Sequence, residues 1–598
     1  MRSDVTFLGT VIRVVGSKVF IELSEALPSS TPIISGKIYK IGQVGSFVKI
    51  PMGTLSAFGI VTMVGANPYK TTDEHAEQFP YGNRWLEIQL IGEATGEKDF
   101  QRGISVYPTI DDEVHIVTDQ DLVLIYATSS PTAIKIGTLA SSEDLSAYID
   151  IDKLLTRHGA ILGSTGSGKS NTVSAILKAI TAGLFPKAKI ILIDPHSEYR
   201  SALKDYAKVF SLEDETNPLQ IPFWGLSYLE LALILFDKKQ AADSPQDTAV
   251  KERIFEYKKE IIDKLKTGAL SPEQITVDSP IPFDIKNLWF TLYEEEFAVV
   301  NTRGDLSTAV YKTDNQSQPI KGDKSKLLPP EYVPPGLGTS APFRFKDQKI
   351  LSSYIHQLGG KVRDNKLSFL FDVDEFDGIN KDLGDLLNIW LNHDKPITIL
   401  DLGGIPFDIM DLVVGLISRI LFESMFWGRN IEGIGRQRPV LLVFEEAHSY
   451  LPKGGSNQTV SGYASKAVRR ICKEGRKYGV GALVISQRPS DLDETILSQC
   501  GTFITLRLSN SQDQSIVGAA MPDNLGSLSD LLPSLRTGEA IIVGESVKVP
   551  SRVRLPLIVP RPDSGDPEPS EQWKITEPEN PNFNLAINNW RKQKIPKT

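Results

Sequence analysis

Short runs of β-branched and apolar residues fill the chain up to about residue 148. Val5–Val15 and Lys18–Leu23 are separated by Gly16 and Ser17, as in a hairpin. Further runs are Phe47–Ile50, Gly59–Val64, Trp85–Ile91, Val114–Val117 and Leu122–Tyr126. Because no helical periodicity separates these runs, the pattern predicts a small closed β-barrel, with a β-sandwich as the alternative.

The pattern changes near residue 150. Ala160–Leu162 is a short apolar run that leads into a glycine-rich loop. After the loop, apolar residues recur at helical spacing from Val173 to Ile180. The next apolar run, Ile190–Ile193, ends in Asp194. A strand, a loop, a helix and a second strand in this order predict a βαβ unit and a parallel sheet.

The middle of the chain interrupts this α/β pattern. Helices are predicted at Tyr228–Phe236, Lys251–Lys266 and Leu383–Leu391, and the proline-rich, polar stretch 301–342 is predicted to be irregular. The α/β pattern then resumes with strands at Ile397–Leu400, Val440–Phe444, Ala482–Ser486 and Phe503–Leu508, and with a long apolar helix at Met410–Trp427. We therefore predict a multidomain protein with an N-terminal small β-barrel (1–148), an α/β core in two parts (149–225 and 396–560), a mostly helical insertion (226–395) and an extended C-terminal tail (561–598).

The net charge of the chain limits the kinds of partner that its surface can bind. Its 598 residues include 65 Lys and Arg against 74 Asp and Glu, a net charge of −9. This balance argues against a surface that is basic overall, although a local basic channel stays open. Two cysteines, Cys472 and Cys500, are too few for a disulfide framework. No apolar run reaches the length of a membrane span, and Asp4 argues against a signal peptide, so we expect a cytoplasmic protein.

The glycine-rich loop matches G-x-x-x-x-G-K-[ST] between a predicted strand and a predicted helix. Such a loop wraps its N–H groups around phosphates, with the helix N-terminus facing the anion. Lys169 is expected to reach the β- and γ-phosphates of ATP, and Ser170 to bind Mg²⁺. The predicted nucleotide-binding residues are Gly163, Ser164, Thr165, Gly166, Ser167, Gly168, Lys169, Ser170 and Asn171.

Hydrolysis also needs an acid that organises the metal and a group that activates water. Val440–Phe444 ends in Glu445 and Glu446, and we expect this strand to lie beside the P-loop strand. Glu445 is assigned to the metal side, and Glu446 to the activation of water. At the end of the next strand, the Gln487 amide is placed to sense the γ-phosphate.

Arginines that can complete the site of a neighbouring subunit are Arg157, Arg470 and Arg476. A solvated helical face is the other interpretation of the charged run around Arg470. The loop Lys453–Lys466, rich in Gly and Ser, can line a pore or be an ordinary surface loop. The basic end of the chain, 582–598, can be a docking arm or a solvated terminus.

As a set, these motifs resemble the HerA family of the HerA/FtsK P-loop ATPases. The resemblance includes Arg157–His158, the run from Ile193 to Tyr199, Glu445–His448, Glu474–Gly479 and Ser486–Pro489. The segment Gly103–Pro108 resembles the N-terminal barrel of that family. Two residues depart from the family pattern: Glu445 stands for the usual Asp, and Ser197 for the usual Gly.

This resemblance implies a RecA-like core, a homohexameric ring and ATP-driven translocation of double-stranded DNA. It also implies a partner effector docked on the barrel, either a nuclease of the NurA or another type, or a sirtuin-like NAD hydrolase. The setting is DNA repair or antiphage defence. The alternative is a nucleotide-gated ring scaffold that regulates such an effector with little translocation.

Overall fold

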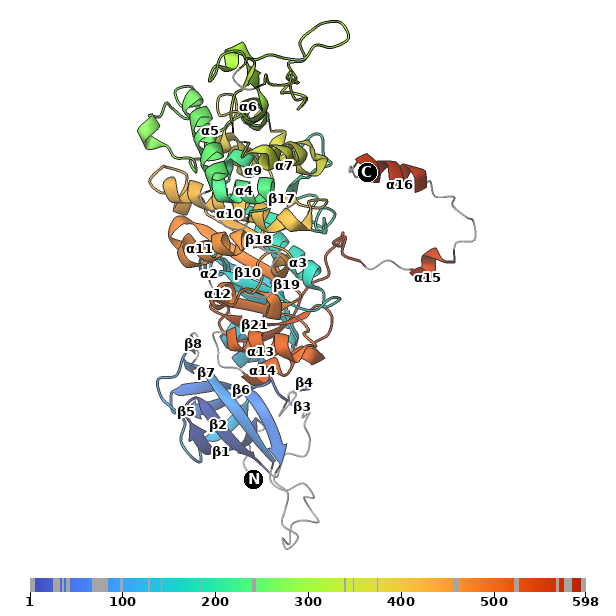
Figure 1. Ribbon diagram of the computed structural model, residues 1–598. Coiled ribbons are helices and arrows are strands. Elements are labelled where there is room, and N and C mark those ends of the chain that lie inside the picture. The colour runs from blue at the N-terminus through green and yellow to red at the C-terminus, as the bar shows by residue number, and fades with distance from the viewer. Residues whose placement is uncertain are drawn as a thin grey trace.

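The computed structural model places a barrel at one end of the molecule, a large sheet in the middle and a helical region at the other end (Figure 1). The C-terminal segment runs away from this body. The structure describes every residue except 1–5, 25–32, 35–36, 39–42, 67–83, 97–99, 127–129, 141, 183, 239–243, 338–339, 348, 374, 455–461, 521–525, 566–568, 575–582 and 593–598.

The N-terminal barrel is closed by antiparallel pairing. Its strands follow the order β2-β1-β9-β5-β6-β7, and pairing of β2 with β7 closes the ring. They are β1 (Phe7–Val15), β2 (Lys18–Leu23), β5 (Phe47–Met52), β6 (Leu55–Ala66), β7 (Arg84–Thr95) and β9 (Glu113–Ile116). The short β8 (Gln101–Arg102) extends β7, while β3 (Ile33–Ile34) and β4 (Lys37–Ile38) pair separately. Apolar residues of alternate positions, such as Val19 and Ile21, fill the interior. The closed barrel is confirmed, and the sandwich is excluded.

One predicted strand of this region is a helix. Leu122–Tyr126 lies within α1 (Asp119–Tyr126). The backbone N–H of Thr118 donates to the Asp121 carboxylate, and that of Asp121 donates to the Thr118 hydroxyl at 3.4 Å. This reciprocal cap favours a helix start, and an apolar run of five residues fits either element. The strand prediction for these residues was therefore wrong.

The core is an eleven-stranded sheet in the order β11-β10-β22-β21-β20-β12-β19-β18-β13-β17-β14. The strands from β20 to β14 in this order are parallel, and the others pair antiparallel. Their bounds are β10 (Ala133–Leu139), β11 (Ser142–Asp150), β12 (Gly159–Leu162), β13 (Lys189–Asp194), β14 (Ala207–Phe210), β17 (Ile397–Asp401), β18 (Val440–Phe444), β19 (Val480–Ser486), β20 (Thr502–Thr505), β21 (Glu539–Gly544) and β22 (Ser551–Arg554). Residues 133–148, which the sequence assigned to the barrel, thus belong to the core sheet.

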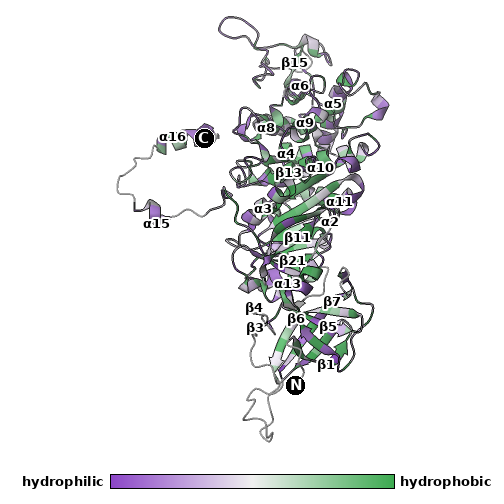
Figure 2. Ribbon diagram, turned by 180° about the vertical axis from the view of Figure 1, so that it is seen from behind, coloured by the Kyte–Doolittle hydropathy of each residue, from purple (hydrophilic) through white to green (hydrophobic). Residues whose placement is uncertain are grey.

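Both faces of the sheet are covered. Successive residues of β12 and β13 alternate between two buried clusters, one that includes α10 and one that includes α3. This explains why the central strands are apolar throughout, as the hydrophobic colour of the core strands in Figure 2 shows. The covering helices are α2 (Ile151–Arg157), α3 (Lys169–Thr181), α10 (Phe407–Trp427), α11 (Tyr463–Tyr478), α12 (Glu494–Ser498), α13 (Ser511–Ala520) and α14 (Gly526–Ser529).

The insertion between β14 and β17 is mostly helical. It contains α4 (Tyr228–Phe236), α5 (Pro245–Ile261), α6 (Ile285–Phe297), α7 (Ser352–Arg363), α8 (Ser368–Phe371) and α9 (Leu383–Leu391), with the short pair β15 (Val299–Val300) and β16 (Phe343–Arg344). α5 begins earlier than predicted because Ser244 caps it.

Short 3₁₀ helices occur in both the insertion and the core. They are η1 (Phe223–Gly225), η2 (Pro272–Gln274), η3 (Leu306–Thr308), η4 (Asn365–Leu367), η5 (Gly435–Gln437), η6 (Ala447–Ser449), η7 (Pro489–Asp491) and η8 (Leu532–Ser534).

The C-terminal tail carries α15 (Pro569–Gln572) and α16 (Phe583–Lys592) outside the core (Figure 1). At the end of α16, the backbone oxygen of Lys592 accepts a hydrogen bond from the Asn365 amide of η4 at 3.3 Å. The suggested basic arm lies partly outside the described residues, as does the suggested pore loop, because 593–598 and 455–461 are not described. Within the described part of the chain, no helix has the length and apolar character needed to cross a membrane.

Candidate functional site

The P-loop connects β12 to α3 at the carboxyl end of the parallel strands. Gly166 and Gly168 have φ of 72° and 95°, the left-handed region that favours glycine. The backbone N–H of Ser164 donates to Arg507 O, and that of Gly538 donates to Ser167 O. The loop is therefore held by the segment that follows β20 and by the turn before β21.

Polar side chains follow the ends of four neighbouring parallel strands. Gln487 follows β19, Glu445 and Glu446 follow β18, Asp194 ends β13 and Asp401 ends β17. In the sheet, β19 lies between β12 and β18. The expectation that the Glu445 strand lies beside the P-loop strand was therefore wrong, because the Gln487 strand takes that place. In such sheets, the carboxyl edge is where ligands bind.

Lys169 connects the P-loop to the glutamate pair. Its Nζ lies 2.7 Å from Glu446 Oε1 and 3.8 Å from Glu445 Oε1. The Gln487 amide nitrogen also donates to Glu446 Oε1, and the Gln487 amide oxygen accepts from Thr165 Oγ1 at 2.6 Å. The structure thus brings four predicted site residues, from three elements, into one network.

Glu446 is held in a strained position. Its φ is 48°, in the left-handed region that costs a residue other than glycine on the order of 1 kcal/mol. His448 Nδ1 lies 3.1 Å from Glu446 Oε2. Burial alone would raise the pKa of Glu446, but His448 and the Lys169 charge outweigh it and lower the pKa to about 2. Glu446 is therefore ionised at neutral pH and can accept a proton.

Glu445 has a different environment. It is fully buried, and its Oε2 accepts a hydrogen bond from the Tyr199 hydroxyl at 2.6 Å. Its Oε1 has no hydrogen-bond partner among the described residues. Burial raises the pKa of Glu445 to about 8, against the opposing effect of Lys169. The two adjacent glutamates therefore have different environments, which fits separate roles on the metal side and in the activation of water.

Ser170 contacts an acid that the sequence analysis did not assign. Its hydroxyl donates to Glu198 Oε2 at 2.8 Å. Glu198 appeared only within the motif that resembles the HerA family, without a role. The available signal was its position, four residues after Asp194 at the end of β13, which places it at the same edge of the sheet as the P-loop.

The backbone conformation and the side-chain contact of Ser197 show how a serine stands where the family pattern has glycine. Its φ is 60°, which accounts for a glycine at this position. Its hydroxyl donates to Asp401 Oδ1 at 2.7 Å. This hydrogen bond to the end of β17 helps to hold a serine in a conformation that glycine adopts without strain.

The residues present fit a magnesium nucleotide. Ser167 Oγ and Glu445 Oε1 are buried oxygens that lack a hydrogen-bond partner within the described chain. Hydroxyl and carboxylate oxygens suit Mg²⁺, which usually takes only one or two protein ligands besides phosphate and water. The described residues contain no cluster of three or more His, Cys, Asp or Glu that could hold an ion alone.

The three candidate arginines make their contacts away from the P-loop. Arg157 ends α2, before the amino end of β12, and its Nε lies 3.2 Å from Glu545 Oε2. Arg470 pairs with Glu423 and lies over the Phe422 ring. Arg476 is exposed near the end of α11. A role of any of them in a neighbouring site stays a prediction.

Asn171 binds the C-terminal segment. Its amide nitrogen donates to Pro556 O, and its amide oxygen accepts from the Ile558 N–H, both at 2.9 Å. Lys178, two helical turns further along this face of α3, donates to Val559 O. The structure therefore gives Asn171 a contact with the chain itself, and its contact with nucleotide stays a prediction.

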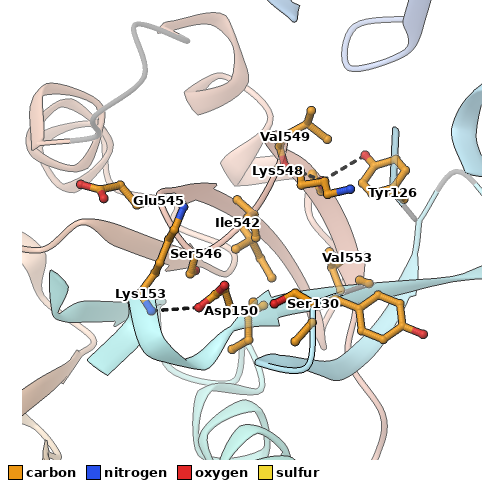
Figure 3. A pocket seen from close by; sticks show the side chains of 16 residues that line it. Tyr126, Ser130, Asp150, Lys153, Ile542, Glu545, Ser546, Lys548, Val549 and Val553 are labelled. Carbon is orange, nitrogen blue, oxygen red and sulfur yellow. Dashed lines mark hydrogen bonds between the residues drawn. The ribbon is translucent and has the colours of Figure 1, made fainter. Parts of the chain in front are cut away.

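A separate cavity of about 230 Å³ lies between α1, β11 and the connection from β21 to β22 (Figure 3). Its lining includes Tyr126, Lys153 and Ser546. No residue that the sequence predicted for the nucleotide site lines it, so it is distinct from the P-loop.

The chain is similar to known proteins in its sequence and in its fold. Residues 134–421 match the family model described as "Helicase HerA, central domain", which begins at β10. The chain is 28% identical over 470 residues to the "DNA double-strand break repair helicase HerA" of Sulfolobus acidocaldarius, covering 78% of this chain and 77% of that protein. It is 27% identical over 497 residues to the "Probable DNA double-strand break repair helicase HerA" of Methanocaldococcus jannaschii, covering 78% and 84%. Among solved structures, it is similar to plasmid coupling protein TrwB in complex with ADP and Mg²⁺, with a TM-score of 0.41 and 12% identity, covering 75% of this chain and 95% of that one.

Proposed function

Because the chain belongs to the HerA family of P-loop ATPases, we propose that it is an ATP-driven double-stranded DNA translocase of HerA type. The protein is an ATPase of the helicase class. The observation that carries the proposal is the network of Lys169, Glu446 and Gln487 at the P-loop, because it joins a phosphate-binding lysine to an ionised glutamate.

The chemistry follows from these contacts. The P-loop N–H groups and the N-terminus of α3 bind the phosphates of ATP, and Lys169 exchanges Glu446 Oε1 for phosphate oxygens. Glu446 then loses one of its two donors at Oε1 and accepts a proton from the attacking water. The Gln487 amide, bound to both Thr165 and Glu446, changes its partners when the γ-phosphate leaves. Mg²⁺, when bound with ATP, neutralises charge on the phosphate oxygens, with Ser170 and Glu445 on its side.

The proposed assembly is a homohexameric ring around DNA. Two features support it: the family, and Arg476, which is exposed near the end of α11. In such rings, an arginine from one subunit stabilises charge in the site of the next. Arg470 and Arg476 are the first candidates on α11, and Arg157 is the candidate at the opposite edge of the sheet.

The barrel is proposed to dock an effector. Apolar side chains remain exposed on its strands, among them Ile12 and Val15 on β1 and Met63 and Val64 on β6. These exposed apolar side chains are the surface that the proposed partner would contact. The proposed partner is a nuclease of the NurA or another type, or a sirtuin-like NAD hydrolase, in DNA repair or antiphage defence.

The rate of ATP hydrolysis with and without linear double-stranded DNA tests this function. A translocase is expected to hydrolyse ATP several times faster when DNA is present, and the stimulation should disappear in Lys169→Ala. A rate that DNA leaves unchanged, in a protein that still hydrolyses ATP, would favour the nucleotide-gated ring scaffold instead.

A further inference from the structure

Ser170 needs a hydrogen-bond acceptor if it is to bind a cation. A serine hydroxyl has one proton and two lone pairs. When a lone pair faces Mg²⁺, the proton must point away from the ion, and an acceptor on that side fixes the orientation of the oxygen. In this protein, the hydroxyl of Ser170 donates to Glu198 Oε2 at 2.8 Å.

Glu445 is not placed to accept this proton. Its Oε2 already accepts from Tyr199, a fully buried residue, and its Oε1 receives no hydrogen bond from any described residue. The cation nearest to Oε1 is Lys169, at 3.8 Å. Glu445 is one methylene longer than the aspartate usual at this position, and the hydroxyl of Tyr199 holds the carboxylate within the core.

The segment that carries Glu198 is fixed on both sides. Before it, Ser197 is anchored to Asp401. After it, the backbone N–H of Tyr199 donates to Asp194 Oδ2 at 3.1 Å. The backbone oxygen of Glu198 itself accepts from the N–H of Asp563, in the C-terminal segment, at 2.7 Å. Anchors on this scale are what a side chain needs to hold a neighbouring ligand in one orientation.

We propose that Glu198 is the positioning residue that orients the Ser170 hydroxyl toward Mg²⁺ in this protein, a role that the glutamate pair after β18 does not take. The inference rests on the proposed ATPase function and specifies the metal side of that site. It also explains why a glutamate is tolerated at position 445, since the orientation of Ser170 does not depend on that residue.

The test compares ADP binding with and without Mg²⁺ by calorimetry on the full-length protein. The measured quantity is the ratio of the Kd in EDTA to the Kd in Mg²⁺, which reports the contribution of the metal. In Glu198→Ala, we expect this ratio to fall about tenfold, or about 1.4 kcal/mol, while the Kd in EDTA changes by less than about twofold. Asp205→Asn, an exposed acid of the same connecting segment, is the matched control and should keep the wild-type ratio.

Conservative substitution separates orientation from charge. Glu198→Gln retains an oxygen that accepts the hydrogen bond from Ser170, so it should recover most of the wild-type ratio. Equal losses in Glu198→Ala and Glu198→Gln would mean that only the charge matters and would overturn the proposal. If Glu198→Ala does not fold, Glu198→Leu gives the same test, because it fills a similar volume without an acceptor and should also lower the ratio about tenfold. An unchanged ratio in a folded Glu198→Leu would overturn the proposal.

The calorimetry distinguishes failure of the proposed ATPase function from failure of the proposed role of Glu198. If the wild-type protein does not bind ADP under either condition, the proposed ATPase function fails. If the wild-type protein binds ADP more tightly with Mg²⁺, and Glu198→Ala does so to the same extent, only the role of Glu198 fails.

Discussion

Substitution of Glu446 by glutamine should have opposite effects on nucleotide binding and on hydrolysis. Glu446 Oε1 accepts from Lys169 Nζ at 2.7 Å, and the side chains of Lys169 and Glu446 are only 8% and 3% exposed. A nucleotide must take Lys169 away from this carboxylate. Removing the negative charge removes the competitor, so ADP should bind more tightly to Glu446→Gln than to the wild-type protein.

The expected change in ADP affinity follows from the strength of the hydrogen bond between Lys169 and Glu446. A hydrogen bond between charged groups contributes about 1.5–3 kcal/mol, and about 1.4 kcal/mol corresponds to a tenfold change in affinity. Glutamine still accepts a weaker hydrogen bond from Lys169, so we expect the lower end, an affinity for ADP about tenfold higher. Hydrolysis should fall by about 10²–10⁴, the usual contribution of a general base.

Two assays on purified Glu446→Gln separate these effects. Calorimetry with ADP measures binding without turnover, and phosphate release from ATP measures hydrolysis. Glu432→Gln, an exposed glutamate without a described contact, is the control for loss of one negative charge. Turnover at the wild-type rate would move the base to Glu445. Binding of ADP weaker than in the wild-type protein would refute the competition between Glu446 and phosphate for Lys169.

Three further predictions concern other regions. Burial lowers the pKa of His158 to about 4, so the stability that neutral His158 contributes is complete above pH 6.5 and is lost as the pH falls toward 4. In thermal melts, His158→Asn should therefore lose less stability over this pH range than the wild-type protein. Equal losses in the two proteins would contradict the prediction. Asn171→Ala removes two hydrogen bonds of about 0.5–1.5 kcal/mol each, so the amide at position 558 should exchange at least about fivefold faster; unchanged protection would show that the C-terminal segment is held elsewhere. Arg470→Ala or Arg476→Ala should lower the ATPase rate without weakening ADP binding, and mixing with Lys169→Ala subunits should restore part of the rate; a stable monomer with full activity at high dilution would exclude action between subunits.

The fold was largely predictable because its central strands have a strong local signal. Ile190–Ile193 and Val440–Phe444 are continuous apolar runs, which a sheet covered on both faces requires. The strand order was not predictable in the same way. Nothing local in Ala482–Ser486 indicates that it lies between β12 and β18, because order in a parallel sheet depends on how the helices cross over. For the same reason, the predicted boundary of the barrel at residue 148 included residues of β10 and β11, which pair in the core sheet.

In the candidate site, too, the residues with a local sequence signal were predictable, and those that depend on tertiary contacts were not. The P-loop and the glutamates after β18 stand in contiguous motifs, so their residues could be named from the sequence. Glu198 acts through Ser170, 28 positions earlier, and Asn171 contacts Pro556, 385 positions later. Such contacts depend on tertiary packing, and the residue types alone do not encode them.

Displacement of a third DNA strand from a triplex tests translocation directly, because a protein that moves along the duplex removes the third strand. With ATP and Mg²⁺, the wild-type protein is expected to release the third strand at a rate that rises with ATP concentration, while Glu446→Gln binds the same duplex and releases none. Release that does not depend on ATP, or ATP hydrolysis stimulated by DNA without any release, would contradict translocation as the function of this protein.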